Sequence, residues 1–170
     1  YEPGSTFKLV TATSSVEENV IKPNEKFTCT GSVTVEGRRI KCWRSYRPHG
    51  SETFEQAVQN SCNPVFVELG KRLGVSRLYD YIEAFGLTSK TGIDLTGEAN
   101  SILYKEKDVG PVELATISFG QSISVTPIQL ITAVSSIAND GKLMQPRLVK
   151  AYTDNEGNIT KEVEPKTVRQ

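Results

Sequence analysis

The chain has 170 residues, the size of one ordinary domain, and its 37% hydrophobic content predicts a buried core. Twenty basic residues balance twenty acidic residues, which argues against a nucleic-acid-binding protein because such proteins usually carry a basic stripe and a high pI. No apolar run approaches the roughly 18 residues that a membrane span requires. Because the sequence opens without methionine, on Tyr1-Glu2-Pro3-Gly4, we expect it to be a piece of a longer protein.

The first predicted element is a helix from Ser5 to about Asn19, because a turn-like Pro3-Gly4 precedes this stretch and neither Gly nor Pro interrupts it. From residue 23 to residue 50 the pattern changes to short strands around Gly31 and Gly37, followed by a loop at residues 47–50. The mixed inward face of the helix would consist of Phe7, Val10, Ser14 and Val16. The strand residues would be Phe27, Cys29, Val33, Val35 and residues 40–43.

Three helices are predicted between residues 53 and 86. Thr53 with Gln56 three residues later forms a capping box that opens a helix through Gln59. Asn63 is a predicted N-cap with Pro64 at the first helical position, and this helix would end at Gly74. The third helix would run from a cap at Ser76 to Gly86.

The second half of the chain begins with residues 86–112, which are rich in Gly, Thr, Ser and Asp and predict a surface excursion. Residues 112–117 predict a short helix, and Thr126-Pro127 opens a longer one that would end at Gly141. Its predicted inward face is Ile128, Ile131, Val134, Ile137 and Ala138. Residues 146–163 predict two strands about a turn at residues 154–157.

The first candidate functional motif is Ser5-Thr6-Phe7-Lys8, an S-x-x-K element at a helix start. Residues three apart share a helix face, so the Lys8 amine can reach the Ser5 hydroxyl. A serine becomes a good nucleophile when a base removes its proton, and lysine can be that base if burial lowers its pKa. By itself the motif is weak, because a chain of this length contains one by chance about every second time.

A second candidate, Ser61-Cys62-Asn63, lies between two predicted helices, where a hydroxyl and an amide can project from one tight turn. Asn63-Pro64 also suits an ordinary helix cap, so this motif alone does not decide the function.

Taken together, these stretches resemble the transpeptidase domain of the penicillin-binding proteins. Residues 1–8 are similar to the family's nucleophile segment, and residues 59–66 to its second motif. Residues 90–98, 118–121 and 125–127 are similar to segments of the monofunctional, class B branch. The resemblance covers essentially all of residues 1–138.

The resemblance implies an α/β (α+β) fold like that of the serine β-lactamases, with a five-stranded antiparallel sheet and helices on both faces. It implies that Ser5 attacks the penultimate D-Ala carbonyl of a peptidoglycan stem peptide, or a β-lactam, and that Lys8 takes its proton. Ser61 would relay a proton toward the leaving amine, and Asn63 would hold the substrate amide. No cofactor would be required for this D,D-transpeptidase chemistry.

The family also has a third motif, Lys-Thr-Gly, on a strand that lines the active site. The letters occur at Lys90-Thr91-Gly92, but within a segment that precedes the residues 118–121 motif in the family, so we interpret them as a coincidence. The functional motif should follow residues 165–170. Residues 1–170 would therefore be one partial transpeptidase domain, mainly helical with a few antiparallel strands, and nearly inactive alone.

Cys29, Cys42, His49 and Cys62 form a candidate metal site, since they could offer four soft ligands to a structural zinc ion. Their spacing matches no standard zinc finger. A Cys29–Cys42 disulfide across paired strands and a set of three buried thiols beside a loop histidine remain open as alternatives.

Two other functions compete with transpeptidation. A class D-like β-lactamase or penicillin sensor also carries Ser-Thr-Phe-Lys, although that group resembles Ser-x-Val, not Ser-x-Asn, at the second motif. A noncatalytic scaffold for cell-wall assembly partners is the other rival. The resemblance further implies a parent protein anchored in the bacterial membrane, with this domain on the extracytoplasmic face.

Overall fold

The computed structural model describes residues 1–170. Its helices are η1 (Gly4–Phe7), α1 (Lys8–Glu17), α2 (Phe54–Gln59), α3 (Asn63–Ala84), η2 (Glu106–Asp108), α4 (Pro111–Ile117) and α5 (Pro127–Ala138). Its strands are β1 (Lys26–Cys29), β2 (Ser32–Val35), β3 (Arg38–Lys41), β4 (Gly50–Thr53), β5 (Leu143–Met144), β6 (Ala151–Thr153), β7 (Ile159–Glu162) and β8 (Thr167–Arg169).

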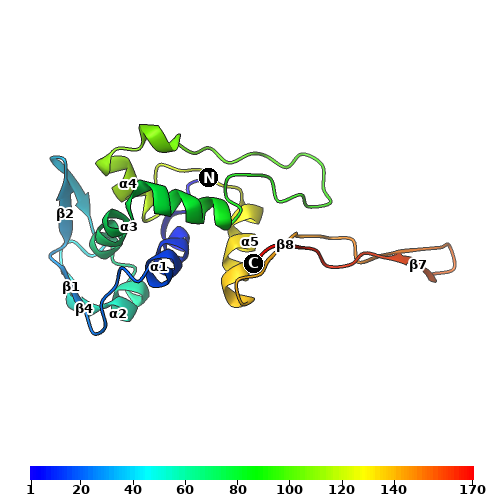
Figure 1. Cartoon of the computed structure of the whole chain (residues 1–170), viewed down its shortest axis with the longest axis horizontal. Helices are drawn as coiled ribbons and strands as arrows, with labels where there is room; N and C mark the ends of the chain where they lie inside the picture. Colours follow the sequence, from blue (N-terminus) through cyan, green and yellow to red (C-terminus); the bar gives the residue numbers. More distant parts are fainter.

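Helices α1, α3 and α4 form the centre of the molecule, with α1 and α4 both packed on α3 (Figure 1). Two buried clusters flank α3. One lies toward β1 and β4, and the other joins the start of α1 to the end of α3 and to α5. The strands form four two-stranded antiparallel pairs, β1–β4, β2–β3, β5–β8 and β6–β7. The prediction of a mainly helical chain with a few antiparallel strands is confirmed.

The N-terminal helix differs from the prediction at both ends. Ser5 lies in the 3-10 helix η1, and the α-helix begins only at Lys8 and ends at Glu17. Phe7, Val10 and Ser14 are fully buried as expected, whereas Val16 is 53% exposed. In the last turn of α1, Val16 therefore faces solvent, while Ser14 and Ser15 face the core.

Predicted caps explain the starts of two other helices, α2 and α5. Thr53 and Gln56 form the capping box of α2, and Thr126 and Gln129 form that of α5. The prediction for Asn63 is wrong, because Asn63 is already inside α3 and its side chain caps nothing. Gly74 interrupts α3 with φ of 76° and ψ of 172°, at the point where two separate helices were expected.

The strands of the N-terminal half contain one element that was not predicted. β4 pairs with β1 in an antiparallel register that sets Cys29 opposite Gly50. Because β3 pairs with β2 instead, Cys29 and Cys42 are not on paired strands, and that premise of the disulfide alternative is wrong. All three cysteines are free thiols.

The predicted inward face of α5 is also wrong. Ile131 is 57% exposed and Ile137 is 37% exposed, while the buried side chains of this helix are Gln129, Leu130, Ala133 and Ser136. Nearly every position of α5 is apolar or small, so the hydrophobic period could not select a face. Gln129 is buried because its Nε2 donates to the carbonyl oxygen of Ser89 at 2.7 Å.

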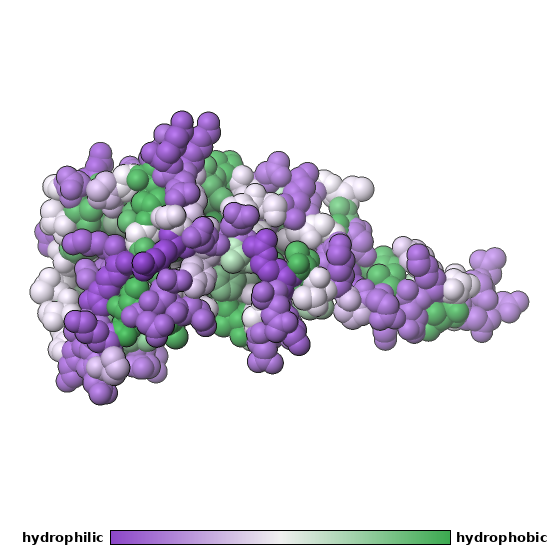
Figure 2. All heavy atoms as spheres, viewed as in Figure 1, coloured by the Kyte–Doolittle hydropathy of each residue, from purple (hydrophilic) through white to green (hydrophobic).

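Residues 150–163, which contain the strands β6 and β7, form an arm that extends away from the helices (Figure 1). The predicted two strands are present as the hairpin β6–β7, with hydrophilic and hydrophobic side chains mixed on its surface (Figure 2). None of the helices is both long enough and apolar enough to cross a membrane.

Candidate active site

Ser5 lies at the surface in η1, while Lys8, one turn later, is buried with only 3% of its surface exposed. Phe7 and Val10 anchor this segment in the core. The S-x-x-K spacing therefore places an accessible hydroxyl and a buried amine on the same side of the helix.

Lys8 does not donate to Ser5 directly. Its Nζ donates to the backbone oxygen of Ser61 at 2.8 Å, to Ser61 Oγ at 2.8 Å and to Asn63 Oδ1 at 2.6 Å. Ser61 Oγ then donates to Ser5 Oγ at 3.0 Å. The two motifs, more than fifty residues apart in sequence, thus form one chain of polar groups, Ser5–Ser61–Lys8, which we call the hydroxyl–amine chain.

Burial lowers the pKa of Lys8 from 10.5 to about 8, against an opposing effect from the nearby thiols of Cys62 and Cys42. The ammonium also lies 5.3 Å from the centre of the Phe66 ring, which forms part of the apolar wall around it. A lysine with a pKa near 8 is partly neutral at physiological pH and can act as a general base.

The turn that carries Ser61 is strained. Ser61 has φ of 50°, a left-handed conformation that is uncommon for residues with a Cβ and that often marks functional sites. Asn63 Nδ2 donates to the backbone oxygen of Lys41 at 3.1 Å, while its Oδ1 faces Lys8. Asn63 is therefore a polar link between Lys8 and the end of β3, which explains why its side chain is not used as a cap.

Gly120 is a positioning residue that the sequence did not single out by itself, although residues 118–121 were noted for their resemblance. Gly4 N donates to the carbonyl oxygen of Gly120 at 2.8 Å. Gly120 has φ of 81°, and a Cβ there would collide with the backbone of Gly4, next to Ser5. The turn that carries Ser5 thus packs on a backbone position that only glycine fits.

Residues 90–92 lie in an irregular segment and not on a strand. The backbone N–H of Thr91 and its hydroxyl both donate to Glu98 Oε1 at 2.6 Å, and Gly92 N donates to Glu98 Oε2 at 3.0 Å. Gln145 also donates to the carbonyl oxygen of Gly92. These donors are engaged in bracing a loop, which supports our interpretation of Lys90-Thr91-Gly92 as a coincidental match.

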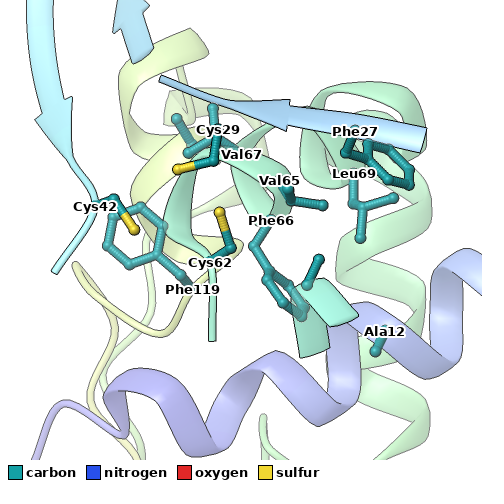
Figure 3. Close-up of a cluster of buried hydrophobic side chains, with 12 residues drawn as sticks. Ala12, Phe27, Cys29, Cys42, Cys62, Val65, Phe66, Val67, Leu69 and Phe119 are labelled. Carbon is teal, nitrogen blue, oxygen red and sulfur yellow. The ribbon is translucent and has the colours of Figure 1, made fainter. Parts of the chain in front are cut away.

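The four candidate metal ligands meet behind the Ser61–Asn63 turn, with their ligand atoms all within 4.8 Å of one another. Figure 3 shows the thiols of Cys29, Cys42 and Cys62 pointing toward a common centre. Cys42 Sγ lies 3.7 Å from His49 Nδ1, close to the ~3.6 Å edge of a tetrahedral zinc site with bonds of about 2.3 and 2.1 Å. The His49 side chain is only 1% exposed, so it is not a solvated loop residue.

Glu52 is a further buried residue at this cluster that the sequence did not reveal. It is 2% exposed, and its Oε1 lies 3.9 Å from His49 Nδ1 without a hydrogen-bond partner. Its other oxygen accepts a bond from Asn60 Nδ2 at 2.9 Å. A buried carboxylate with an unpaired oxygen beside three thiols suits the presence of a cation. The donor set therefore fits a zinc ion.

Hydrogen bonds among Ser5, Ser61, Lys8 and Asn63, and not a pocket, define the candidate active site. A hollow of about 540 Å³ lies between β2, α3 and the start of α4, lined in part by Val33, Val67 and Leu114. It touches none of the residues of the hydroxyl–amine chain.

Comparison with known proteins agrees with this geometry. The family model for the penicillin-binding protein transpeptidase domain matches residues 1–170. Stage V sporulation protein D of Bacillus subtilis is 49% identical over 155 residues, which are 91% of this chain and 24% of that protein. Peptidoglycan D,D-transpeptidase MrdA of Haemophilus influenzae is 30% identical over 162 residues, 89% of this chain and 25% of that protein.

A solved structure of a penicillin-binding protein also matches this chain. The ceftriaxone acyl-enzyme complex of penicillin-binding protein A from Mycobacterium tuberculosis matches with a TM-score of 0.86 and 26% identity, over 100% of this chain and 39% of that one. The chain thus spans about a quarter of the length of the curated relatives named above. A whole-length match to the family model, with both expected motifs meeting in one site, shows that the chain belongs to the penicillin-binding protein transpeptidase family, in its class B branch.

Proposed function

We propose that the protein to which this chain belongs is a peptidoglycan D,D-transpeptidase that cross-links stem peptides through an acyl-enzyme on Ser5. The hydroxyl–amine chain is the observation that carries the proposal, because it links an exposed serine to a buried lysine of lowered pKa. The names of the relatives support the same reaction, as does the acyl-enzyme described for a structural neighbour.

In the proposed reaction, Ser5 Oγ attacks the carbonyl carbon of the penultimate D-Ala. With Lys8 neutral, the two hydrogen bonds reverse over the same contacts of 3.0 and 2.8 Å, so that Ser5 donates to Ser61 Oγ and Ser61 donates to Lys8 Nζ. The Ser5 proton then passes through the Ser61 hydroxyl to Lys8. The C–N bond to the terminal D-Ala breaks as the leaving amine takes a proton back through Ser61. A neutral amine of a second stem peptide then attacks the acyl carbon and gives a proton to Lys8. The C–O bond to Ser5 breaks as Ser5 Oγ takes this proton back through Ser61, which completes the cross-link.

Asn63 has two roles in this proposal. Its Oδ1 accepts a hydrogen bond from Lys8 before the substrate binds, and its amide would hold a substrate amide once the peptide lies along the end of β3. The acyl transfer itself needs no metal or organic cofactor.

The proposed function is tested by supplying the full-length protein with a stem pentapeptide and an acceptor amine. We expect release of D-Ala with formation of the cross-linked peptide, and both should disappear in Ser5→Ala. The matched control is Thr6→Ala, which removes a neighbouring hydroxyl that bonds only to the Pro3 carbonyl oxygen. Rapid, repeated hydrolysis of a β-lactam without any cross-linked product would favour the β-lactamase alternative instead.

The scaffold alternative makes a different prediction, because a scaffold has no need for an intact nucleophile and base. If the full-length protein neither released D-Ala nor reacted with β-lactams, the scaffold function would replace the enzyme. For the active protein, we propose β-lactam antibiotics as inhibitors and a site of action on the extracytoplasmic face of the membrane, where cell-wall assembly partners would meet it.

We further propose that Cys29, Cys42, His49 and Cys62 bind a structural zinc ion. Their ligand atoms converge, and Glu52 places a buried carboxyl oxygen without a hydrogen-bond partner near His49. Cys62 stands between Ser61 and Asn63, and Cys42 follows the Lys41 carbonyl that Asn63 binds. A zinc ion held there would brace both ends of the second motif without touching the reacting atoms.

A further inference from the structure

The segment from Arg38 to Arg47 carries a concentration of positive charge that the proposed reaction does not use. No acidic residue occurs between residues 37 and 51, although acidic and basic residues balance over the whole chain. We call these ten residues the basic segment, and its cations are Arg38, Arg39, Lys41, Arg44 and Arg47.

These cations are not neutralised by the protein. The salt bridges of the structure involve only His49, Arg72 and Arg77 as the basic partners. Within the basic segment, the one side-chain hydrogen bond made by a cation is from Arg39 Nε to Ser32 Oγ at 3.0 Å. Five like charges within ten residues produce a positive local potential, which attracts acidic ligands.

The basic segment borders the active site at two points. The Lys41 carbonyl oxygen accepts from Asn63, and the indole N–H of Trp43 donates to the Asn60 carbonyl oxygen at 2.8 Å. Asn60 and Asn63 flank Ser61, so the segment lies against the turn that completes the hydroxyl–amine chain. A peptide that reaches Ser5 would therefore pass near the segment.

The segment is also held in place. One end is strand β3, paired with β2, and the other leads to the buried His49. Trp43 packs at an angle against the His49 ring, with centroids 5.7 Å apart, yet remains 61% exposed. The segment thus presents a fixed aromatic surface among cations.

We propose that the basic segment binds the free carboxylates of an acidic stem peptide and guides its reacting end to Ser5, with Trp43 as an apolar contact. This inference rests on the proposed function, since it names a feature of that function's substrate. Carboxylates on the middle residues of the peptide would meet Lys41 and Arg44 first, because these cations flank the contacts to Asn63 and Asn60. A neutral glycan would gain nothing from five cations.

The test compares two stem pentapeptides, one with free carboxylates on its middle residues and one with these groups amidated. D-Ala release by the full-length double variant Lys41→Gln/Arg44→Gln is compared with D-Ala release by the full-length parent, once with each peptide. We expect kcat/KM for the acidic peptide to fall about five-fold at low salt, mainly through KM, as for two exposed charge pairs. The loss should shrink at 0.5 M salt and be absent with the amidated peptide.

The matched control is Lys150→Gln/Lys161→Gln, which removes two cations from the arm at the opposite end of the molecule from β2 (Figure 1). This control variant should leave kcat/KM unchanged for both peptides. An equal loss with both peptides, or no loss with either, would overturn the inference. So would variants that lose binding to phosphatidylglycerol vesicles while keeping peptide selectivity, because the surface would then face a membrane. Penicillin should label Ser5 of the parent in every one of these outcomes, whereas failure of the proposed function would leave Ser5 unlabelled.

Discussion

Lys8 can accept a proton only in its neutral form, and burial lowers its pKa to about 8. Below pH 8 the neutral fraction falls about ten-fold per pH unit, so the rate of acylation by penicillin should fall in the same way and level off above pH 8. Lys8→Ala should slow acylation by about 10²–10⁴-fold. Single-turnover acylation measured from pH 6 to pH 9.5 checks both expectations. A flat profile for the parent would show that Lys8 is not the base.

Gly120 offers a test of how the turn that carries Ser5 is positioned. In Gly120→Ala the new Cβ meets the Gly4 backbone, so both the melting temperature and the rate of Ser5 acylation should fall. Gly157→Ala is the matched control, because Gly157 also has positive φ, 89°, but faces open space on the arm. It should lose only about 1 kcal/mol of stability and keep its acylation rate. Equal effects from the two substitutions would mean that Gly120 has no special contact with the active site.

At the residue level, the two short motifs predicted a common site only through their joint resemblance to the family. Ser5, Lys8, Ser61 and Asn63 each lie within a short motif with recognisable spacing, and the structure brings them together. The route between them could not be predicted, because Lys8 reaches Ser5 through Ser61 and this depends on the packing of α1 against α3. Glu52 carries no local signal, since its burial follows from the β1–β4 pairing.

At the level of elements, the Cys/His cluster joins β1, the end of β3, the loop before β4 and the start of α3. Because structural zinc contributes folding energy, full-length protein washed free of loose ions should contain close to one zinc per chain. Cys42→Ser should lower both the zinc content and the melting temperature, whereas Ser51→Ala, a small change on nearby β4, should alter neither. Metal-free protein with a linked Cys29–Cys42 peptide would replace the zinc with a disulfide.

The contrast between α2 and α5 shows what the sequence encodes locally. Both begin at capping boxes, which involve residues three apart, and both starts were predicted correctly. The buried face of α5 was predicted wrongly, because its residues are apolar around most of the helix. Only tertiary contacts determine that Leu130 and Ala133 are buried and Ile131 is not. β4 was missed because its four residues, Gly50–Thr53, lack an alternating apolar pattern.

At the scale of the whole molecule, the exposed apolar side chains of α5 and the projecting arm suggest that residues 1–170 depend on further chain for stability. We expect these residues alone to be poorly soluble or partner-dependent, and nearly inert toward penicillin. Supplying the chain beyond Gln170, linked or as a separate polypeptide, should restore labelling of Ser5. Lys90→Ala in the restored protein should acylate within a few-fold of the parent. A hundred-fold loss would show that Lys90-Thr91-Gly92 is the functional third motif.

The proposed acyl-enzyme on Ser5 is checked by the intact mass of the full-length protein after treatment with penicillin. We predict one added penicillin per chain, located on Ser5 by peptide digestion and absent from Ser5→Ala, while Thr6→Ala remains labelled. A label that persists in Ser5→Ala, or an unchanged mass of the parent, would show that Ser5 does not form the acyl-enzyme.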